Sequence, residues 1–379
     1  MFHNEIYKIL SQYNLDDITI GVLGGHSALD VCHGAKKHGF KTLAVCRIGR
    51  EKTYAKYYKT RDGKGCVDDV ILVESFSDIL KPEIQEELRK RNTIFIHNRY
   101  FWVYFSDPSR VEKEFFVPIF GSREMLKLEE RDVEKNQYYL LQSAGIRTPK
   151  IYDNPKEIHP DRTGPVIVKV NEAIRGYERS FFVAKDYADF CAQRDRLISE
   201  GKITKAALDR AVIEEFVLGA PINFNYFYSP LTGELELIGT DIRRQTSLDG
   251  FLRLPADIQM DVLGKCRPTM VETGHIACTT KESILEKAFE IGEKFIALTA
   301  KEVPPGIIGP FALQGAVSAE KGCEEIVIFD VSMRIPGSPG TRFTPLTGYL
   351  YGDTISYGER IAMEIREGVK SGRMIELLT

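Results

Sequence analysis

The sequence lacks the features that define several large classes of protein. Its seven cysteines form no CxxC pair and no cysteine–histidine cluster with zinc-ligand spacing, and their number is odd. A disulfide-stapled secreted domain is therefore not indicated, and a reduced compartment, the cytoplasm, is expected. No apolar run approaches the length of a membrane span. The first residues, MFHNEIYKILSQYN, have the pattern of a short amphipathic helix and not of a signal peptide.

A strong charge of either sign is also missing. The formal net charge is -3, and there is no basic patch with interleaved aromatic residues of the kind that binds nucleic acid. We find no internal repeat and no low-complexity tract. The chain has 379 residues, of which 43% are hydrophobic and 28% are charged. These values are typical of a globular protein with two or three domains.

The N-terminal region alternates strands and helices. Residues 18–23 (ITIGVL) predict a buried strand, followed by a Gly-Gly-His-Ser loop, a helix and a second strand in KTLAVCRIG. This order predicts a parallel α/β sheet, in which ligands bind at the carboxyl ends of the strands. His26 and Ser27 lie at such an end, before a helix N-terminus that favours anions. Ser27 is equally explained as a helix N-cap, whereas His26 favours a ligand contact.

Neither common phosphate-binding fingerprint is present, because the loop contains no GxGxxG and no GxxxxGK[ST]. Further strands are predicted in VDDVILVES, NTIFIHNRYF and VPIFGS, and a long charged helix is predicted up to Gly145. Arg99 follows one of these strands, where it either clamps a phosphate or is a solvated loop arginine. Residues 1–122 are thus predicted to form an N-terminal α/β domain.

The middle of the chain predicts a strand hairpin in GPVIVKVNEAIRGYERSFFVAKD. Lys169 closes the first strand, where it either reaches phosphates as a mobile charge or is an exposed strand lysine. Arg175 and Arg179 add positive charge to the following loop. A helix and the strand AVIEEFVLG come next, and this strand offers backbone groups to an adenine and carboxylates (Glu214 and Glu215) to ribose hydroxyls.

The last part of the chain predicts a second sheet, with strands in INFNYFYSP, ELELIGTDIRRQ and FLRLP. Two apolar runs, IIGPFALQG and EEIVIFDVS, flank a charged turn and predict an antiparallel strand pair. Gln314 lies on the first run, Asp330 on the second, and Arg334 follows. An amide oxygen and a carboxylate beside an arginine suit Mg²⁺ on nucleotide phosphates. The alternative is a half-buried strand pair whose polar residues face solvent.

The order of these segments resembles the ATP-grasp superfamily and, within it, the archaeal 5-formaminoimidazole-4-carboxamide ribonucleotide synthetases of purine biosynthesis. The similar segments are collinear over nearly the whole chain and include GGHSALDVCHGAKKHGF, FVPIFGSREML, PVIVKV, IEEFVLG, LDGFLRLPA, VPPGIIGPFALQG and VIFDVSMRIPG. The resemblance implies a mixed α/β and α+β architecture, an ATP-grasp fold with an N-terminal Rossmann-like (pre-ATP-grasp) parallel α/β domain. It divides the remainder into a small lid subdomain at 123–220 and a large subdomain at 221–379 that carries the metal site.

The resemblance also implies an activity. In this family ATP phosphorylates formate, and the amine of the aminoimidazole carboxamide ribotide attacks the formyl phosphate, with release of ADP and phosphate on the route to IMP. Joining anionic substrates requires a cation-rich, metal-bridged site. The implied cofactors are ATP and Mg²⁺ or Mn²⁺. The implied partners are these small molecules and further copies of the chain in a homo-oligomer, not nucleic acid or a membrane.

Site residues follow from the resemblance by position. Gln314 and Asp330 are expected to hold the metal, and Arg334 is expected to be catalytic. The ribotide is expected to contact His26, Ser27, Arg99 and Ser247. The expected ATP-binding residues are Lys135, Lys169, Arg175, Arg179, Glu214, Glu215, Phe216 and Val217.

One departure from the family pattern lies in the loop after Lys169. The family has a glycine-rich flap over the triphosphate, but residues 171–182 (NEAIRGYERSFF) contain one glycine in a longer loop. Non-glycine side chains hinder close approach of the backbone to phosphate. Arg175 and Arg179 either replace the backbone amides with charge or mark an altered site.

Other departures fall at ligand-facing positions. Arg99 replaces a serine-type contact, residues 244–247 replace a Tyr-Glu-Ser-Asn stretch, Arg342 replaces an asparagine and Asp330 replaces a glutamate. The scaffold segments, in contrast, are kept. Two alternatives therefore stay open beside the family activity. One is a diverged ATP-grasp ligase for another acid or amine, and the other is a paralogue that binds a nucleotide or ribotide without turnover.

Overall fold

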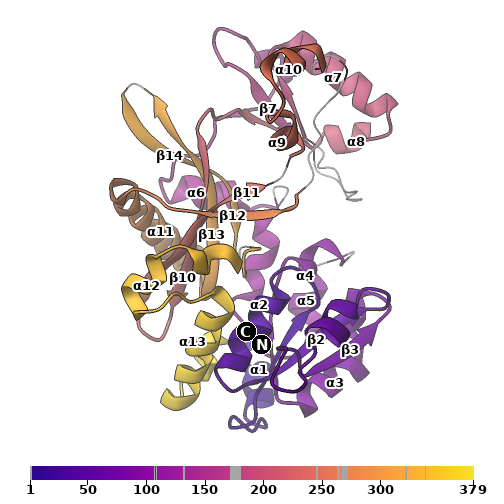
Figure 1. Ribbon diagram of the computed structural model, residues 1–379, viewed down its shortest axis with the longest axis vertical. Coiled ribbons are helices and arrows are strands. Elements are labelled where there is room, and N and C mark those ends of the chain that lie inside the picture. The colour runs from indigo at the N-terminus through magenta and orange to yellow at the C-terminus, as the bar shows by residue number, and fades with distance from the viewer. Residues whose placement is uncertain are drawn as a thin grey trace.

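Three β-sheets organise the chain (Figure 1). The computed structural model describes residues 2–105, 107, 109–130, 133–170, 181–244, 246–262, 265, 272–320, 322–337 and 339–379. Two sheets have five strands and the third has four. In the view of Figure 1 the first sheet lies at the lower end, the second in the middle and the four-stranded sheet at the upper end. None of the described helices combines the length and apolar character that crossing a membrane requires.

The first sheet is parallel throughout, which confirms the α/β organisation predicted for the N-terminal region. Its strand order is β3-β2-β1-β4-β5. The central strand β1 is buried along its whole length, as expected for a parallel strand covered on both faces. The strands span Thr19–Leu23 (β1), Lys41–Arg47 (β2), Asp69–Val73 (β3), Thr93–Ile96 (β4) and Ile119–Phe120 (β5), and the helices span Ala28–Lys37 (α2), Pro82–Lys90 (α3), Tyr100–Val103 (α4) and Ser109–Glu114 (α5).

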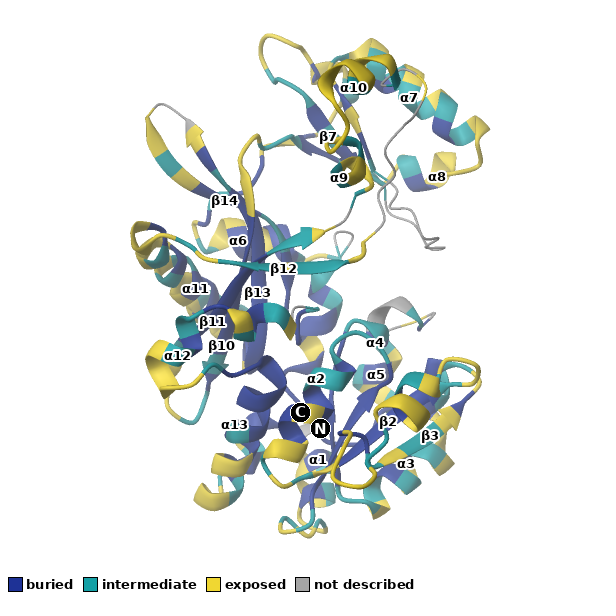
Figure 2. Ribbon diagram, in the orientation of Figure 1, coloured by how far each residue is buried: buried dark blue, intermediate teal, exposed yellow. Residues whose placement is uncertain are grey.

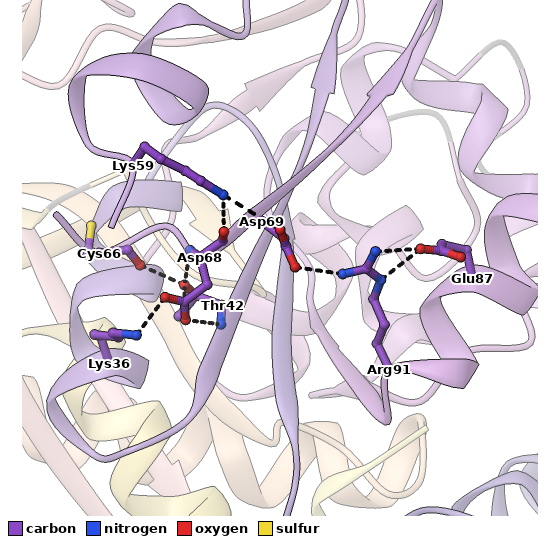
Figure 3. Close-up of polar contacts among 8 residues, drawn as sticks. All are labelled: Lys36, Thr42, Lys59, Cys66, Asp68, Asp69, Glu87 and Arg91. Atoms are coloured by element: carbon purple, nitrogen blue, oxygen red, sulfur yellow. Dashed lines mark hydrogen bonds and ion pairs between the residues drawn. The ribbon is translucent and has the colours of Figure 1, made fainter. Parts of the chain in front are cut away.

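Polar contacts fix the edge of this sheet (Figure 3). The carboxylate of Asp68 accepts a hydrogen bond from the backbone N–H of Thr42 at 3.1 Å and pairs with Lys36 of α2 at 2.6 Å. The next residue, Asp69, pairs with Arg91 after α3 at 2.7 Å. These contacts join β2, β3 and the two helices, but their partial exposure limits the stability that each ion pair contributes.

The second sheet is antiparallel, with the strand order β12-β11-β10-β13-β14. Helix α11 (Glu282–Glu302) packs against it through an apolar stripe that includes Ala288 and Phe295. Gly292 permits this close packing, because a Cβ there would lie 2.7 Å from Leu235. Figure 2 shows the long strands of this sheet as largely buried. The strands span Ala220–Ser229 (β10), Glu234–Arg244 (β11), Gly274–Cys278 (β12), Gly309–Glu320 (β13) and Cys323–Ser332 (β14).

The smallest sheet is antiparallel in the order β6-β9-β7-β8, and β7 and β8 form the predicted hairpin. Its own hydrophobic cluster includes Val168, Phe182 and Phe190. Residues 171–180, most of the predicted flap, lie outside the described residues. The strands span Ile151–Tyr152 (β6), Val166–Lys169 (β7), Phe181–Ala184 (β8) and Val212–Glu215 (β9), and the helices span Tyr187–Ser199 (α7) and Lys205–Leu208 (α8).

The C-terminal residues return to the first sheet. Helix α13 (Tyr357–Ser371) packs on α2, where Gly34 and Gly358 allow the two backbones to touch. The last residue, Thr379, exchanges backbone hydrogen bonds with Ile119 at 2.9 and 3.0 Å. The apolar residues of this tail share one core with β1, β4 and helix α1 (Phe2–Leu10). The predicted boundaries at 122 and 220 remain predictions, and the tail of the third predicted domain contacts the first.

Three secondary-structure predictions are wrong. The long charged helix before Gly145 is a 3₁₀ turn (Arg123–Glu129) and a separate helix, α6 (Gln137–Ser143), because Asn136 accepts hydrogen bonds from two N–H groups and starts a new helix. The single helix predicted after β8 is divided by Gly201 at φ +67° into α7 and α8. FLRLP is not a strand, because Phe251 ends α9 (Leu248–Phe251) and the next four residues form the turn that leads into α10 (Ala256–Val262).

Candidate active site

A polar pocket lies between the first sheet and the five-stranded antiparallel sheet. It encloses about 360 Å³, part of it open to solvent. Its wall combines three arginines, two histidines, three side-chain amides and one carboxylate, so the pocket suits an anionic ligand. The lining residues are His26, Arg99, Asn223, Asn225, Arg243, Glu272, His275, Ala312, Gln314, Ser332, Arg334, Pro336 and Gly337.

The loops after β1 and β4 bring His26 and Arg99 into this pocket, as the parallel sheet predicted. The amide of Asn98 donates hydrogen bonds to the backbone oxygens of Leu23 at 3.0 Å and His26 at 3.2 Å, which fixes the His26 loop. Burial, followed by the charges of Arg334 and Arg99, lowers the pKa of His26 to about 3. The imidazole is therefore neutral at physiological pH and offers the ligand one donor and one acceptor.

Ser27 neither caps the following helix nor lines the pocket. Its backbone is left-handed, with φ 67°, and its hydroxyl makes no capping bond to α2. The hydroxyl instead donates to the backbone oxygen of Pro336 at 2.7 Å. This bond ties the β1 loop to the segment after β14 and so holds the two walls of the pocket together. A direct ligand contact by Ser27 remains a prediction.

His97 is fully buried behind the pocket, and burial, followed by the charge of Arg334, lowers its pKa to about 3. Because the unfolded chain takes up a proton near pH 6.5, His97 contributes stability that is present above pH 6.5 and lost as the pH falls towards 3. Between pH 6.5 and 4.5 the stability advantage of the wild type over His97→Leu should fall by about 1.4 kcal/mol per pH unit. Thermal unfolding of both proteins across this range measures the difference. His159→Leu, at an exposed site, is the control, and a pH-independent difference would contradict the prediction.

Strands β13 and β14 form the opposite wall. They pair antiparallel as predicted, and Gln314 and Asp330 are register partners. The amide nitrogen of Gln314 donates to Ser332 at 3.0 Å, and its oxygen accepts a hydrogen bond from Arg243 at 2.5 Å. The oxygen predicted as a metal ligand thus already faces a guanidinium.

Arg334 is buried at the bottom of the pocket, with 3% of its surface exposed. One of its nitrogens lies 3.3 Å from the carboxylate of Glu129, another donates to the backbone oxygen of Ile335 at 3.2 Å, and Nε has no hydrogen-bond partner. The second oxygen of Glu129 accepts from the backbone N–H of Met333 at 2.7 Å. Burial lowers the pKa of Arg334 and raises that of Glu129, and the attraction between the two groups opposes both effects.

Sequence reasoning missed a polar network on β10, β11 and β12. Asp241, fully buried, accepts hydrogen bonds at 2.7 Å from the amides of Asn223 and Asn225 and contacts Nδ1 of His275 at the same distance. Burial alone would lower the pKa of His275, but the carboxylates of Asp241 and Glu272 raise it above its ordinary value. The alternation of the two asparagines along one strand was the available signal. Strand β12, which carries His275, was not predicted.

A second polar cluster lies where β7 and β9 of the smallest sheet meet β14. Lys169 forms an ion pair with Glu214 and lies 3.3 Å from both the hydroxyl of Tyr138 and the backbone oxygen of Phe329. Tyr138 donates to the other oxygen of Glu214 at 2.5 Å. The lysine therefore lies beside Asp330, the residue that follows Phe329. Because Glu214 is engaged by two partners, its carboxylate does not point freely towards a ribose.

The other predicted ATP-binding residues that the structure describes have different surroundings. Glu215 pairs with Arg147 at 3.0 Å, and the backbone N–H of Phe216 donates to Pro165 at 3.1 Å. Val217 is half-buried in the segment before β10. Lys135 pairs with Glu302 at the end of α11 at 3.0 Å. Their nucleotide contacts remain predictions.

Three other predicted residues are not among those that line the pocket. Ser247 is exposed at the start of α9 and does not line the pocket. Arg175 and Arg179 lie outside the described residues. Their roles also remain predictions.

Asp330 is a suitable anchor for a divalent metal at this site. The described part of the chain contains no group of three or more histidine, cysteine, aspartate or glutamate side chains that could enclose a metal ion. Mg²⁺, however, commonly uses one or two carboxylates and completes its coordination with substrate phosphates and water. Asp330 is half-buried and near enough to Arg334 and Glu129 to act on the pKa of each. Asp330 therefore fits a nucleotide-bound metal better than Gln314 does.

Comparison with known proteins agrees with this architecture. A family model described as a domain of unknown function (DUF1297) matches residues 189–379, and one described as a protein of unknown function (DUF1246) matches residues 20–152. The 5-formaminoimidazole-4-carboxamide-1-(beta)-D-ribofuranosyl 5'-monophosphate synthetase of Methanothermobacter thermautotrophicus is 38% identical, over 99% of this chain and 98% of the relative.

Two solved structures extend the comparison. The IMP biosynthesis protein PurP from Thermococcus kodakaraensis has a TM-score of 0.69 and 25% identity, over 95% of this chain and all of that chain. Phosphoribosylglycinamide synthetase from Anaerococcus prevotii has a TM-score of 0.53 and 17% identity, over 94% of this chain and 77% of that chain, and supports the fold alone.

The three sheets, the polar pocket and these likenesses define an ATP-grasp ligase, an enzyme that forms a carbon–nitrogen bond. Within this class, the family follows from the 38% identity to the Methanothermobacter synthetase over 99% of this chain. The chain belongs to the family of 5-formaminoimidazole-4-carboxamide ribonucleotide synthetases.

Proposed function

We propose that this protein formylates the amine of 5-aminoimidazole-4-carboxamide ribonucleotide with formate and ATP, as the names of its relatives suggest. The γ-phosphoryl group of ATP passes to a formate oxygen and ADP is released. The amine nitrogen attacks the formyl carbon, the bond from that carbon to the phosphate oxygen breaks, and the nitrogen loses a proton. The products are the 5-formamido ribonucleotide, ADP and phosphate, in IMP biosynthesis.

The observation that carries the proposal is the gathering of Arg99, Arg243 and Arg334 around one pocket. Formate, the acyl phosphate and the ribonucleotide phosphate are all anions, so a pocket with three guanidinium groups lowers the repulsion among them. His26 is neutral there, which suits hydrogen bonds to the uncharged carboxamide and amine of the ribonucleotide.

ATP would bind on the side of this pocket where Lys169 and Asp330 lie. Lys169 would exchange Glu214 for the nucleotide phosphates, as a flexible ammonium group allows. Asp330 would hold Mg²⁺ or Mn²⁺, which polarises the transferred phosphoryl group. Arg334, fixed by Glu129 beneath the pocket, would attract the anions as they react.

The decisive experiment measures phosphate release from ATP and Mg²⁺ with formate and the ribonucleotide together, and with each omitted. The proposal expects release that requires both substrates and formation of the formamido product. Release without formate but with another acid would indicate the diverged ligase. Binding of the ribonucleotide with no release under any condition would indicate the paralogue without turnover.

Two further features complete the proposal. The chain would work in the cytoplasm, where ATP and the ribonucleotide are available, and the free buried cysteines Cys32, Cys46 and Cys66 are compatible with a reducing compartment. A homo-oligomer is proposed from the family resemblance, and analytical ultracentrifugation of the full chain would test it.

A further inference from the structure

One carboxylate enters the cationic pocket, and its position is informative. Glu272 precedes β12 and brings one oxygen within 3.7 Å of Nε of Arg243 and the other within 3.6 Å of Nε2 of His275. Both distances exceed the ~2.7–2.9 Å of a charge-assisted hydrogen bond. Glu272 therefore faces Arg243 and His275 at ion-pair distance, without a short hydrogen bond in either of these two pairs.

The two groups that it faces are held in place from behind. Arg243 donates through another nitrogen to Gln314 at 2.5 Å, while its Nε is buried without a hydrogen-bond partner. A carboxylate oxygen of Asp241 lies 2.7 Å from Nδ1 of His275 and orients the ring. The other ring nitrogen, Nε2, therefore faces Glu272 in the pocket. A bond at Nδ1 to a buried carboxylate fixes the orientation and favours a proton on both ring nitrogens. Two fixed donors thus converge on one position.

We propose that Arg243 and His275 form a subsite for a small oxyanion, and that the carboxylate of Glu272 occupies this subsite until the oxyanion displaces it. The ligand is a carboxylate or phosphate oxygen pair, which can approach both donors more closely than the tethered side chain does. The inference rests on the proposed function for the identity of the anion, but the binding itself requires no turnover.

The surroundings favour the reacting anion over the distal phosphate of the ribonucleotide. Arg243 bonds to Gln314, whose register partner is Asp330, the proposed metal ligand. The subsite therefore lies next to the place where phosphoryl transfer would occur, which is where formate and its acyl phosphate must bind. Arg99, from the loop after β4 in the first sheet, remains for the ribonucleotide phosphate.

The first test is calorimetric titration of the full chain with inorganic phosphate and, separately, with sodium formate, without ATP. Glu272→Gln should bind the anion more tightly, because a neutral amide competes less well for the two donors, and a competitor that fills a site about nine-tenths of the time lowers the apparent affinity about tenfold. His275→Asn and Arg243→Met should weaken binding by a similar factor. Glu376→Gln, which removes a carboxylate from an exposed ion pair with Arg373, is the matched control and should change nothing.

Steady-state kinetics then identify the occupant. A lower KM for formate in Glu272→Gln, without a matching fall in the KM for the ribonucleotide, supports a subsite for the reacting anion. A lower KM for the ribonucleotide alone supports the subsite and assigns it to the 5'-phosphate. The proposal is overturned if Glu272→Gln binds phosphate and formate as the wild type does, or more weakly. Absence of turnover in the wild type would remove the proposed function yet leave the calorimetric result valid.

Discussion

Asp330→Ala is expected to abolish turnover and to leave ribonucleotide binding nearly unchanged. Asp330 follows Phe329, whose backbone oxygen lies 3.3 Å from Lys169, and it is the register partner of Gln314, which lines the cationic pocket. A metal ion at a transferring phosphoryl group supplies several kcal/mol of transition-state stabilisation, so its loss should slow phosphate release by about a thousandfold or more. Phosphate release measures turnover, and calorimetric titration with the ribonucleotide measures binding.

Asp330→Glu provides a sharper comparison than a surface control alone. It keeps the carboxylate and lengthens the side chain by one methylene. Activity retained in Asp330→Glu but lost in Asp330→Ala would assign the effect to the carboxylate. Asp353→Ala, in an exposed loop after α12 (Leu346–Tyr351), should behave as the wild type. Equal turnover in the wild type and Asp330→Ala would exclude Asp330 as the metal ligand.

The walls of the pocket differ in how well the sequence predicted them. The apolar runs around Gln314 and Asp330 have strand composition and a short turn between them, so antiparallel pairing follows from local pattern alone. His26 and Arg99 follow strands of one parallel sheet, and the carboxyl ends of such strands meet at one edge. Their convergence could therefore be predicted without knowing any long-range contact.

The network around Asp241 could not be predicted in this way. It requires β10 to lie between β11 and β13, and it requires the short strand β12 at the edge. β12 is half-buried and only five residues long, and its sequence GHIAC lacks the alternation that marks a strand. The sequence therefore gives no local signal that His275 and Glu272 complete the pocket.

The roles assigned to Lys135, Glu214 and Ser27 show a different limit. Each was selected by its position in the sequence, but the partner of each depends on a distant segment: Glu302 for Lys135, Tyr138 for Glu214 and Pro336 for Ser27. A charged or polar side chain pairs with the nearest complementary group when it is buried or half-buried. Local sequence does not specify that group when it comes from another sheet or helix.

Arg334→Met should destabilise the protein strongly. It removes a buried cation from beside the Glu129 carboxylate, whose side chain is about one-tenth exposed. Glu129 then keeps the hydrogen bond from the backbone N–H of Met333 but has lost the charge that balanced its own. Breaking one partner of a buried ion pair typically costs about 3–5 kcal/mol. The melting temperature of the variant, measured by calorimetry, should fall accordingly, and the anionic substrates should bind more weakly.

The double variant Arg334→Met with Glu129→Gln separates two effects of losing Arg334: the unbalanced charge on Glu129 and the lost packing of the arginine side chain. A glutamine at 129 can still accept the hydrogen bond from Met333, which the carboxylate accepts at 2.7 Å in the wild type. Most of the lost stability should therefore return, because the uncompensated charge is gone, whereas activity should stay low, because the pocket lacks its buried guanidinium. A double variant as unstable as Arg334→Met would show that the arginine acts through its packing and not through its charge on Glu129.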